Sequence, residues 1–159
     1  MNAMGIRVAK DYFRWAVVSK NEDELNIVAK GKMSAPKTYD EADSLAWYRE
    51  RVQTIAKQHG AKMAAVRFSE TFLGRGRGPT SKVLESMLMR ARIEGVITEA
   101  LRADGLPVGT GGWQKISARM GTRSAKAYTD SGEVRGLSIA DEPEELQDAI
   151  TAAISMFGK

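Results

Sequence analysis

Four carboxylates in this sequence stand where strands are expected to end or a helix is expected to begin. Asp11 follows the first apolar stretch of the chain, and Glu70 comes just past the fourth. Glu145 and Asp148 are three residues apart near the start of an expected helix, so both project from one of its faces. Carboxylates that converge at one edge of a sheet repel one another unless cations lie between them, and Mg²⁺ is an ion that such oxygen ligands hold. Two such ions about 4 Å apart can activate a water molecule and stabilise the leaving oxygen of a phosphodiester.

Alternating strand and helix patterns would position these carboxylates. The expected elements are strands over 6–10, 13–19 and 25–29, a helix over 41–59, a strand over 63–68, a helix over 81–104, a strand over 106–108 and a helix over 144–156. Asp40 and either Thr80 or Ser81 are suitable N-caps for the first two helices. The order β-β-β-α-β-α-β-α predicts an α/β fold, in which three antiparallel strands are followed by alternating helix and strand. The resulting mixed sheet is flanked by helices and has its first strand beside its fourth.

The stretch over 109–137 is polar and shows no regular pattern beyond a helical turn around 124–128. We expect it to be irregular. Because the last helix must return to pack on the same core, this stretch is expected to be a functional loop rather than a linker. The whole chain, 1–159, is therefore expected to form one domain.

The composition is that of an ordinary globular protein, with 43% hydrophobic and 28% charged residues. No apolar run approaches the roughly 20 residues that a membrane-spanning helix needs. The N-terminus becomes charged too early for a signal peptide, so a cytoplasmic protein without a membrane contact is expected. The chain has no cysteine, which excludes a disulfide scaffold and a thiolate zinc site.

Basic residues gather in two stretches, although the net charge of +4 is small. The first contains a Gly-Arg-Gly-Arg-Gly loop over 74–78, whose glycines let the backbone approach a phosphate while its arginines pair with it. In the second, Trp113 lies close to Lys115 and is a candidate for stacking on a base. The side chains expected to contact nucleic acid on these grounds are Arg75, Arg77, Lys82, Trp113, Lys115, Arg119 and Arg123.

The order of the elements and the placement of the acids resemble the RNase H-like superfamily, and within it the RuvC-type Holliday-junction resolvases. The segments that carry the resemblance are Val8-Ala9-Lys10-Asp11, Glu70-Thr71-Phe72-Leu73-Gly74-Arg75, the helix from Ser81 with Gly95, Trp113-Gln114-Lys115, Gly121-Thr122-Arg123-Ser124-Ala125-Lys126 and Glu145-Leu146-Gln147-Asp148-Ala149-Ile150. The likeness extends over nearly the whole chain, and it rests on the order and spacing of these segments.

This resemblance implies an RNase H-like mixed five-stranded sheet and an endonuclease that hydrolyses phosphodiesters in branched DNA. It implies Mg²⁺ or Mn²⁺ as the cofactor, held by Asp11, Glu70, Glu145 and Asp148. Lys126, with Lys115, would contact the scissile phosphate, and Phe72 would wedge between bases at the junction centre. A homodimer through the helix over 81–104 is also implied, because a four-way junction offers two equivalent cleavage sites.

The sequence departs from the family's pattern around its first acid. Tyr12-Phe13-Arg14 leaves almost no turn after Asp11, and Lys10 replaces an apolar residue. Glu145 also stands where Asp is usual. A competing alignment, shifted by one residue in the first strand and by three in the fourth, places Lys10 and Arg67 at the catalytic positions. Under that alignment the protein is a catalytically inactive RuvC-like subunit that binds nucleic acid or takes part in an assembly.

Overall fold

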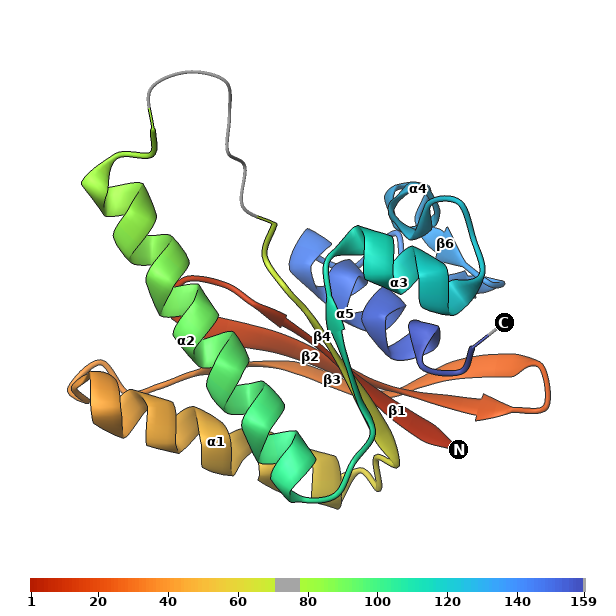
Figure 1. Ribbon diagram of the computed structural model, residues 1–159. Coiled ribbons are helices and arrows are strands. Elements are labelled where there is room, and N and C mark those ends of the chain that lie inside the picture. Colours follow the sequence, from red (N-terminus) through yellow and green to blue (C-terminus); the bar gives the residue numbers. More distant parts are fainter. Residues whose placement is uncertain (71–77, 159) are drawn as a thin grey trace.

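The computed structural model describes residues 1–70 and 78–158. Its elements in chain order are β1 (Asn2–Val8), β2 (Tyr12–Asn21), β3 (Glu24–Ser34), α1 (Glu41–Gln58), β4 (Met63–Arg67), α2 (Ser81–Ala103), β5 (Val108–Gly111), α3 (Trp113–Met120), α4 (Ala125–Asp130), β6 (Glu133–Val134), β7 (Leu137–Ser138) and α5 (Glu144–Ser155). Figure 1 shows the sheet with helices packed against it. The predicted α/β class is confirmed.

The main sheet has five strands in the order β3-β2-β1-β4-β5. The first three strands pair antiparallel as the predicted meander, and β4 and β5 then join in parallel. Parallel neighbours require crossover connections, which the helices between them supply. The prediction that the first strand lies beside the fourth is therefore confirmed, and β1 is central.

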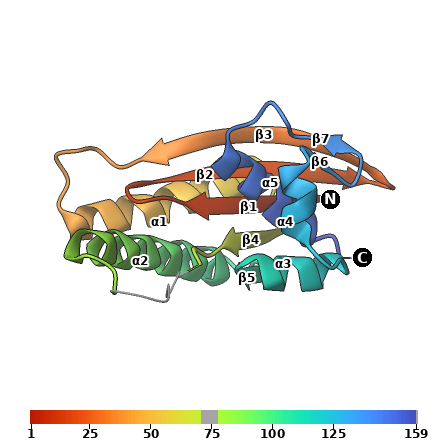
Figure 2. The same cartoon turned by 90° about the horizontal axis from the view of Figure 1, so that it is seen from above.

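Two hydrophobic layers cover the two faces of this sheet. Met4, Ile6 and Val8 of β1 point to the layer formed with α1 and α2. The alternate residue Ala3 points to the other layer, which contains α3 and α5. Figure 2 shows α3, α4 and α5 gathered towards one end of the sheet. No helix in the described residues combines the length and the apolar character needed to cross a membrane.

Gly5 sets how closely α5 approaches the central strand. A Cβ atom at this position would lie 1.8 Å from the carbonyl oxygen of Ala149 and 2.6 Å from the backbone nitrogen of Ala153. No side chain fits in that space, so the backbone of α5 rests directly on β1. This close approach brings the side chain of Arg7, two residues after Gly5, towards that of Asp148, which precedes Ala149.

The structure corrects the expectation of an irregular 109–137 stretch. It forms α3, whose buried residues Trp113, Ile116, Ser117 and Met120 recur at helical spacing. The helix ends at Gly121, which has a φ of 64°. The helical turn expected around 124–128 is confirmed as α4, capped by Ser124. The polar residues between the apolar ones in α3 concealed a face that becomes apolar only when the helix forms.

The first strand also ends earlier than expected. β1 stops at Val8, and the Ala9 N–H donates to the carbonyl oxygen of Tyr12 at 2.8 Å, which closes a turn containing Lys10 and Asp11. β1 begins at Asn2 instead of Ile6 because β2 is long enough to pair with it as far as Ser19. This shift changes which residues stand at the end of the central strand.

Candidate functional site

Two arginines stand at the ends of the central parallel strands. Arg7 of β1 and Arg67 of β4 are direct register partners. Both belong to the set of alternate strand residues, with Ala3 and Ala65, that faces α5. Arg67 is only 6% exposed, which is unusual for a residue type that is almost never fully buried without a partner. The sequence positions these side chains in otherwise apolar strands.

The partner of both arginines is Asp148 in the first turns of α5. Its Oδ2 atom lies 3.3 Å from Arg7 Nε and 3.2 Å from Arg67 Nε, and the residue is 7% exposed. Asp148 precedes Ala149, the residue that Gly5 allows to rest on β1. One buried carboxylate thus forms ion pairs with two guanidinium groups.

A second buried carboxylate, Glu94, approaches the same place from α2. Its Oε1 atom accepts hydrogen bonds from the Ser69 N–H at 2.8 Å and from Ser69 Oγ at 3.0 Å. Arg7 Nη1 donates to Ser69 Oγ at 2.9 Å and lies 4.0 Å from Glu94 Oε1. Arg7 therefore lies between Glu94 and Asp148, and the network joins α2 on one face of the sheet to α5 on the other.

Burial dominates the electrostatics of these groups. It raises the pKa of the Asp148 carboxyl above its ordinary value, against the opposing effect of Arg67 and Arg7. It likewise raises the pKa of Glu94, against the hydrogen bonds from Ser69. The pKa of Arg67 is lowered, first by burial and then by repulsion from Arg7. Each charge here depends on its partners, because a buried charge without one is costly.

Glu70 lies at the start of α3, near enough to Arg67 to favour its charged form but outside the ion pairs of the network. Its Oε1 atom accepts a hydrogen bond from the Trp113 N–H at 2.8 Å, and a Cβ atom at Gly112 would lie 2.5 Å from that oxygen. A carboxylate there satisfies one of the unpaired N–H groups of the helix and complements its dipole. The Arg67 guanidinium covers the Trp113 ring, 4.7 Å from its centroid. Trp113 is 9% exposed, and the face of its ring that Arg67 covers is not available for the predicted stacking on a base.

The other two predicted ligands also have different surroundings. Asp11 is exposed in the turn after β1, where its carbonyl oxygen accepts a hydrogen bond from the Tyr48 hydroxyl. Glu145 accepts a hydrogen bond from Tyr12 Oη at 2.8 Å and lies 3.5 Å from Arg14 Nε. No group of three or more His, Cys, Asp or Glu residues that could hold a metal exists in the described part of the chain, and segment 71–77 contains none of these residue types.

The expectation that the four acids converge is therefore corrected. Its physical cause is twofold: the turn after Val8 leaves Asp11 exposed, and the register of β1 with β4, together with the close approach of α5 at Gly5, places Arg7 opposite α5. The residues present at this edge do not fit a divalent cation, because two guanidinium groups already lie within 3.3 Å of its Asp148 carboxylate. Of the two residues of the competing alignment, Arg67 lies at this edge and Lys10 is exposed in the turn.

Three residues of the network, Arg7, Ser69 and Glu94, were missed by the sequence analysis. Arg7 could have been found as a charge between Ile6 and Val8 in a strand expected to be central. Glu94 follows Ile93 on the buried side of a helix, which is a similar signal. Nothing in the sequence singles out Ser69.

The predicted nucleic-acid contacts are distributed unevenly. Lys82, Lys115 and Arg123 are exposed. Arg119 instead turns inward, where its Nε donates to Ser155 Oγ at 3.2 Å and its Nη1 to the Thr110 carbonyl oxygen at 3.3 Å. Arg119 is therefore partly buried, and its role as a DNA contact stays a prediction. Phe72, Arg75 and Arg77 lie outside the described residues.

One of these exposed basic residues, Arg123, lines a hollow between α3 and α4. This hollow, of about 420 Å³, is lined by Trp113, Gln114, Ser117, Ala118, Thr122, Arg123 and Ser124. Lys126 follows it and pairs with Asp130, whose Oδ2 lies 2.7 Å from the lysine Nζ. Hydrogen bonding to Asp130 raises the pKa of this lysine.

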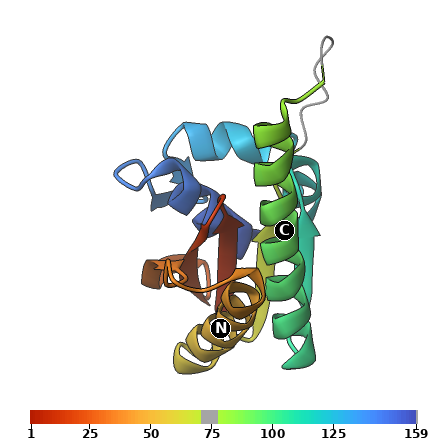
Figure 3. The same ribbon diagram turned by 90° about the vertical axis from the view of Figure 1, so that its left-hand side faces the viewer.

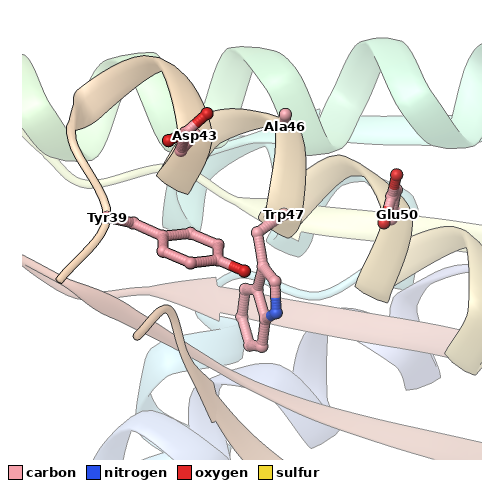
Figure 4. A pocket seen from close by; sticks show the side chains of 5 residues that line it. All are labelled: Tyr39, Asp43, Ala46, Trp47 and Glu50. Carbon is pink, nitrogen blue, oxygen red and sulfur yellow. The ribbon is translucent and has the colours of Figure 1, made fainter. Parts of the chain in front are cut away.

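A second hollow lies along α1, on the other face of the sheet. Figure 4 shows Tyr39 and Trp47 turned towards each other there, with Asp43 and Glu50 along the same helix. Its volume is about 320 Å³. Two carboxylates in its lining make it a poor match for a phosphate backbone.

The sheet order and the flanking helices are those of an RNase H-like α/β fold. No family model matches the chain, and the curated proteins include no significant match.

Solved structures identify the fold more closely. Thermus thermophilus RuvC superimposes with a TM-score of 0.68 at 16% identity, over 98% of this chain and 92% of that one. The same protein in complex with a Holliday junction substrate gives 0.66 at 17% identity, over the same shares. The yeast mitochondrial Holliday junction resolvase Ydc2 gives 0.60 at 13% identity, over 96% of this chain and 76% of that one. The chain has a RuvC-like resolvase fold.

Proposed function

We propose that this protein binds branched DNA through its RuvC-like fold and does not hydrolyse it. The observation that carries the proposal is the Arg7–Asp148–Arg67 arrangement at the edge where the sequence analysis expected a metal centre. Hydrolysis assisted by metal ions needs oxygen ligands free to hold them. The carboxylate of Asp148 is engaged by two cationic side chains instead.

DNA binding is supported by the fold and by the distribution of basic residues. One of the similar RuvC structures is a complex with a Holliday junction substrate. In this chain, exposed Arg123 lines the hollow between α3 and α4, and exposed Lys115 lies on α3, on the side of the sheet covered by α5. Such side chains contribute affinity by neutralising phosphates, without any need for catalysis. Arg75 and Arg77 stay predicted DNA contacts on sequence grounds alone.

The first half of α2 supports self-association. Val83, Leu84 and Leu88 are 48%, 46% and 49% exposed, and they project from a part of the helix that extends beyond the sheet (Figures 1 and 3). Apolar side chains gathered in this way mark interaction surfaces. We infer that two copies pair through α2, which a mass measurement in solution would show.

Hydrolysis is the second candidate, favoured by the fold shared with Holliday junction resolvases. One experiment separates the two candidates. The protein is incubated with a labelled four-way junction and with a linear duplex of the same sequence, in Mg²⁺, in Mn²⁺ and in EDTA. We expect retention of the junction in all three conditions and no cut strand. Strand cleavage in Mg²⁺ or Mn²⁺ that is absent in EDTA would establish hydrolysis, and failure to retain either DNA would refute the binding function.

A further inference from the structure

Arg7, Arg67 and Asp148 converge at one edge of the sheet, as the ligands of an ion site do. Two of these three side chains are cationic, whereas the ligands of a metal ion would be acidic. Adjacent strands lie about 4.8 Å apart, so register partners on them direct their side chains to neighbouring points. Arg7 and Arg67 occupy such a pair, and Asp148 reaches both from α5. Three elements thus supply side chains to one point.

The acids around Arg7 show that this point requires positive charge. Asp148 lies on one side of its guanidinium and Glu94 on the other, and the two acids are 7% and 6% exposed. Two carboxylates buried to this degree stay ionised only with a cation close to them, and otherwise take up a proton. The two arginines supply that positive charge through side chains, so the two acids and the two arginines together carry no net charge that a free ion would balance.

We propose that Arg7 and Arg67 supply, beside Asp148 and Glu94, the positive charge that a bound divalent ion would otherwise supply. Replacing both arginines with acids should then convert this edge into a Mg²⁺ or Mn²⁺ site. In the R7D/R67E variant, two new carboxylates would face Asp148, with Glu94 nearby and no guanidinium left between them. A divalent ion then becomes the means of neutralising the buried acids. This inference deepens the proposed lack of hydrolysis and rests on that part of the proposal alone, not on DNA binding.

The test measures Mn²⁺ binding without any DNA. Isothermal titration and thermal melting are carried out on the parent protein, on R7D/R67E and on R7M/R67M, which removes the same charges but adds no ligand. We expect no saturable binding to the parent and no change in its melting temperature with Mn²⁺ or EDTA. R7D/R67E should bind Mn²⁺ at least about 10-fold more tightly than R7M/R67M, and its melting temperature should rise with the ion.

A further substitution assigns the binding to this edge. Adding Asp148→Asn to R7D/R67E should abolish the gain in affinity. If R7D/R67E is unfolded without metal, circular dichroism should show it folding as Mn²⁺ is added, because ion binding then supplies folding free energy.

Three results would overturn the inference. One is saturable Mn²⁺ binding by the parent that Asp148→Asn removes, since the arginines would then not exclude the ion. Another is a folded R7D/R67E variant with no more affinity than R7M/R67M. The third is an R7D/R67E variant that remains unfolded at millimolar Mn²⁺. None of these readouts depends on the junction, so their outcome is separable from that of the DNA-binding proposal.

Discussion

Arg7 and Arg67 are register partners on adjacent parallel strands, and their Nε atoms lie 3.3 Å and 3.2 Å from the same Oδ2 atom of Asp148. Two like charges are therefore held side by side by one carboxylate in a nearly dry environment. The arrangement depends on Gly5, because the approach of α5 to β1 brings Asp148 within reach. It gives the molecule a stabilising centre in the place where hydrolysis would require bound ions.

Asp148→Asn should destabilise the protein strongly. Removing one partner of a buried ion pair costs about 3–5 kcal/mol, because the remaining charges stay buried and unpaired. Urea denaturation followed by circular dichroism measures the change in the free energy of unfolding. Asp130→Asn is the matched control, because the Asp130 side chain is 59% exposed and its pair with Lys126 should contribute at most about 1 kcal/mol. Equal losses in the two variants would contradict the role assigned to Asp148.

The contact at Gly5 predicts a large difference between two Gly→Ala substitutions. Gly5→Ala places a methyl group 1.8 Å from the Ala149 carbonyl oxygen, so α5 must move and about 1–3 kcal/mol or more of stability is lost. Gly95→Ala, inside α2, meets no atom within 4 Å and should stabilise the helix by up to about 1 kcal/mol. Thermal melting of both variants tests whether the first loses stability and the second gains it. A Gly5→Ala protein as stable as the parent would mean that α5 does not rest on β1.

Stability should depend on pH through Glu94. Burial raises the pKa of this carboxyl above 4.5, so the folded chain holds the proton more tightly than the unfolded chain. Stability from this group is therefore present at low pH and lost as pH rises from about 4.5 through the folded-state pKa. Glu94→Gln should flatten that part of the curve of unfolding free energy against pH.

The control for this prediction is Glu99→Gln. The Glu99 side chain is 60% exposed on the same helix, and its variant should follow the parent's pH curve. If the Glu94→Gln curve also coincided with the parent's in shape, Glu94 would not be the buried acid that the structure shows.

The proposed DNA surface predicts a change in the salt dependence of binding. Lys115→Gln and Arg123→Gln should each weaken junction binding and lower the slope of log affinity against log salt by about 1. Lys62→Gln removes an equal charge at the opposite end of β4 from Arg67 and should leave the slope unchanged. Filter binding over a range of salt concentrations gives the three slopes. A similar effect from all three variants would indicate a non-specific attraction and no defined surface.

Much of the fold could be predicted because it depends on local patterns. The apolar spacing of Tyr48, Val52 and Ile55 indicated α1, and these residues are buried in one layer. The antiparallel meander followed by alternating elements placed β1 beside β4. The prediction missed α3, although its buried residues recur at helical spacing, because the helix has only 8 residues and periodicity is recognised over windows of about 11–18.

The candidate site was harder to predict because it depends on strand register. A strand ending at Lys10 would carry Asp11 on past the edge, whereas the turn after Val8 leaves Asp11 exposed. Arg7 reaches the edge through its register with Arg67 on β4, which is a long-range pairing that no local pattern shows. Asp148 could be predicted as an acid of this edge. The cations beside it were expected to be Mg²⁺ ions, whereas they are the side chains of Arg7 and Arg67.

The most direct measurement is a crystal structure from crystals soaked in Mn²⁺, with an anomalous difference map. The account predicts both guanidinium groups in contact with the Asp148 carboxylate and no anomalous peak beside it. A Mn²⁺ peak coordinated by Asp148, with Arg7 and Arg67 displaced, would contradict it.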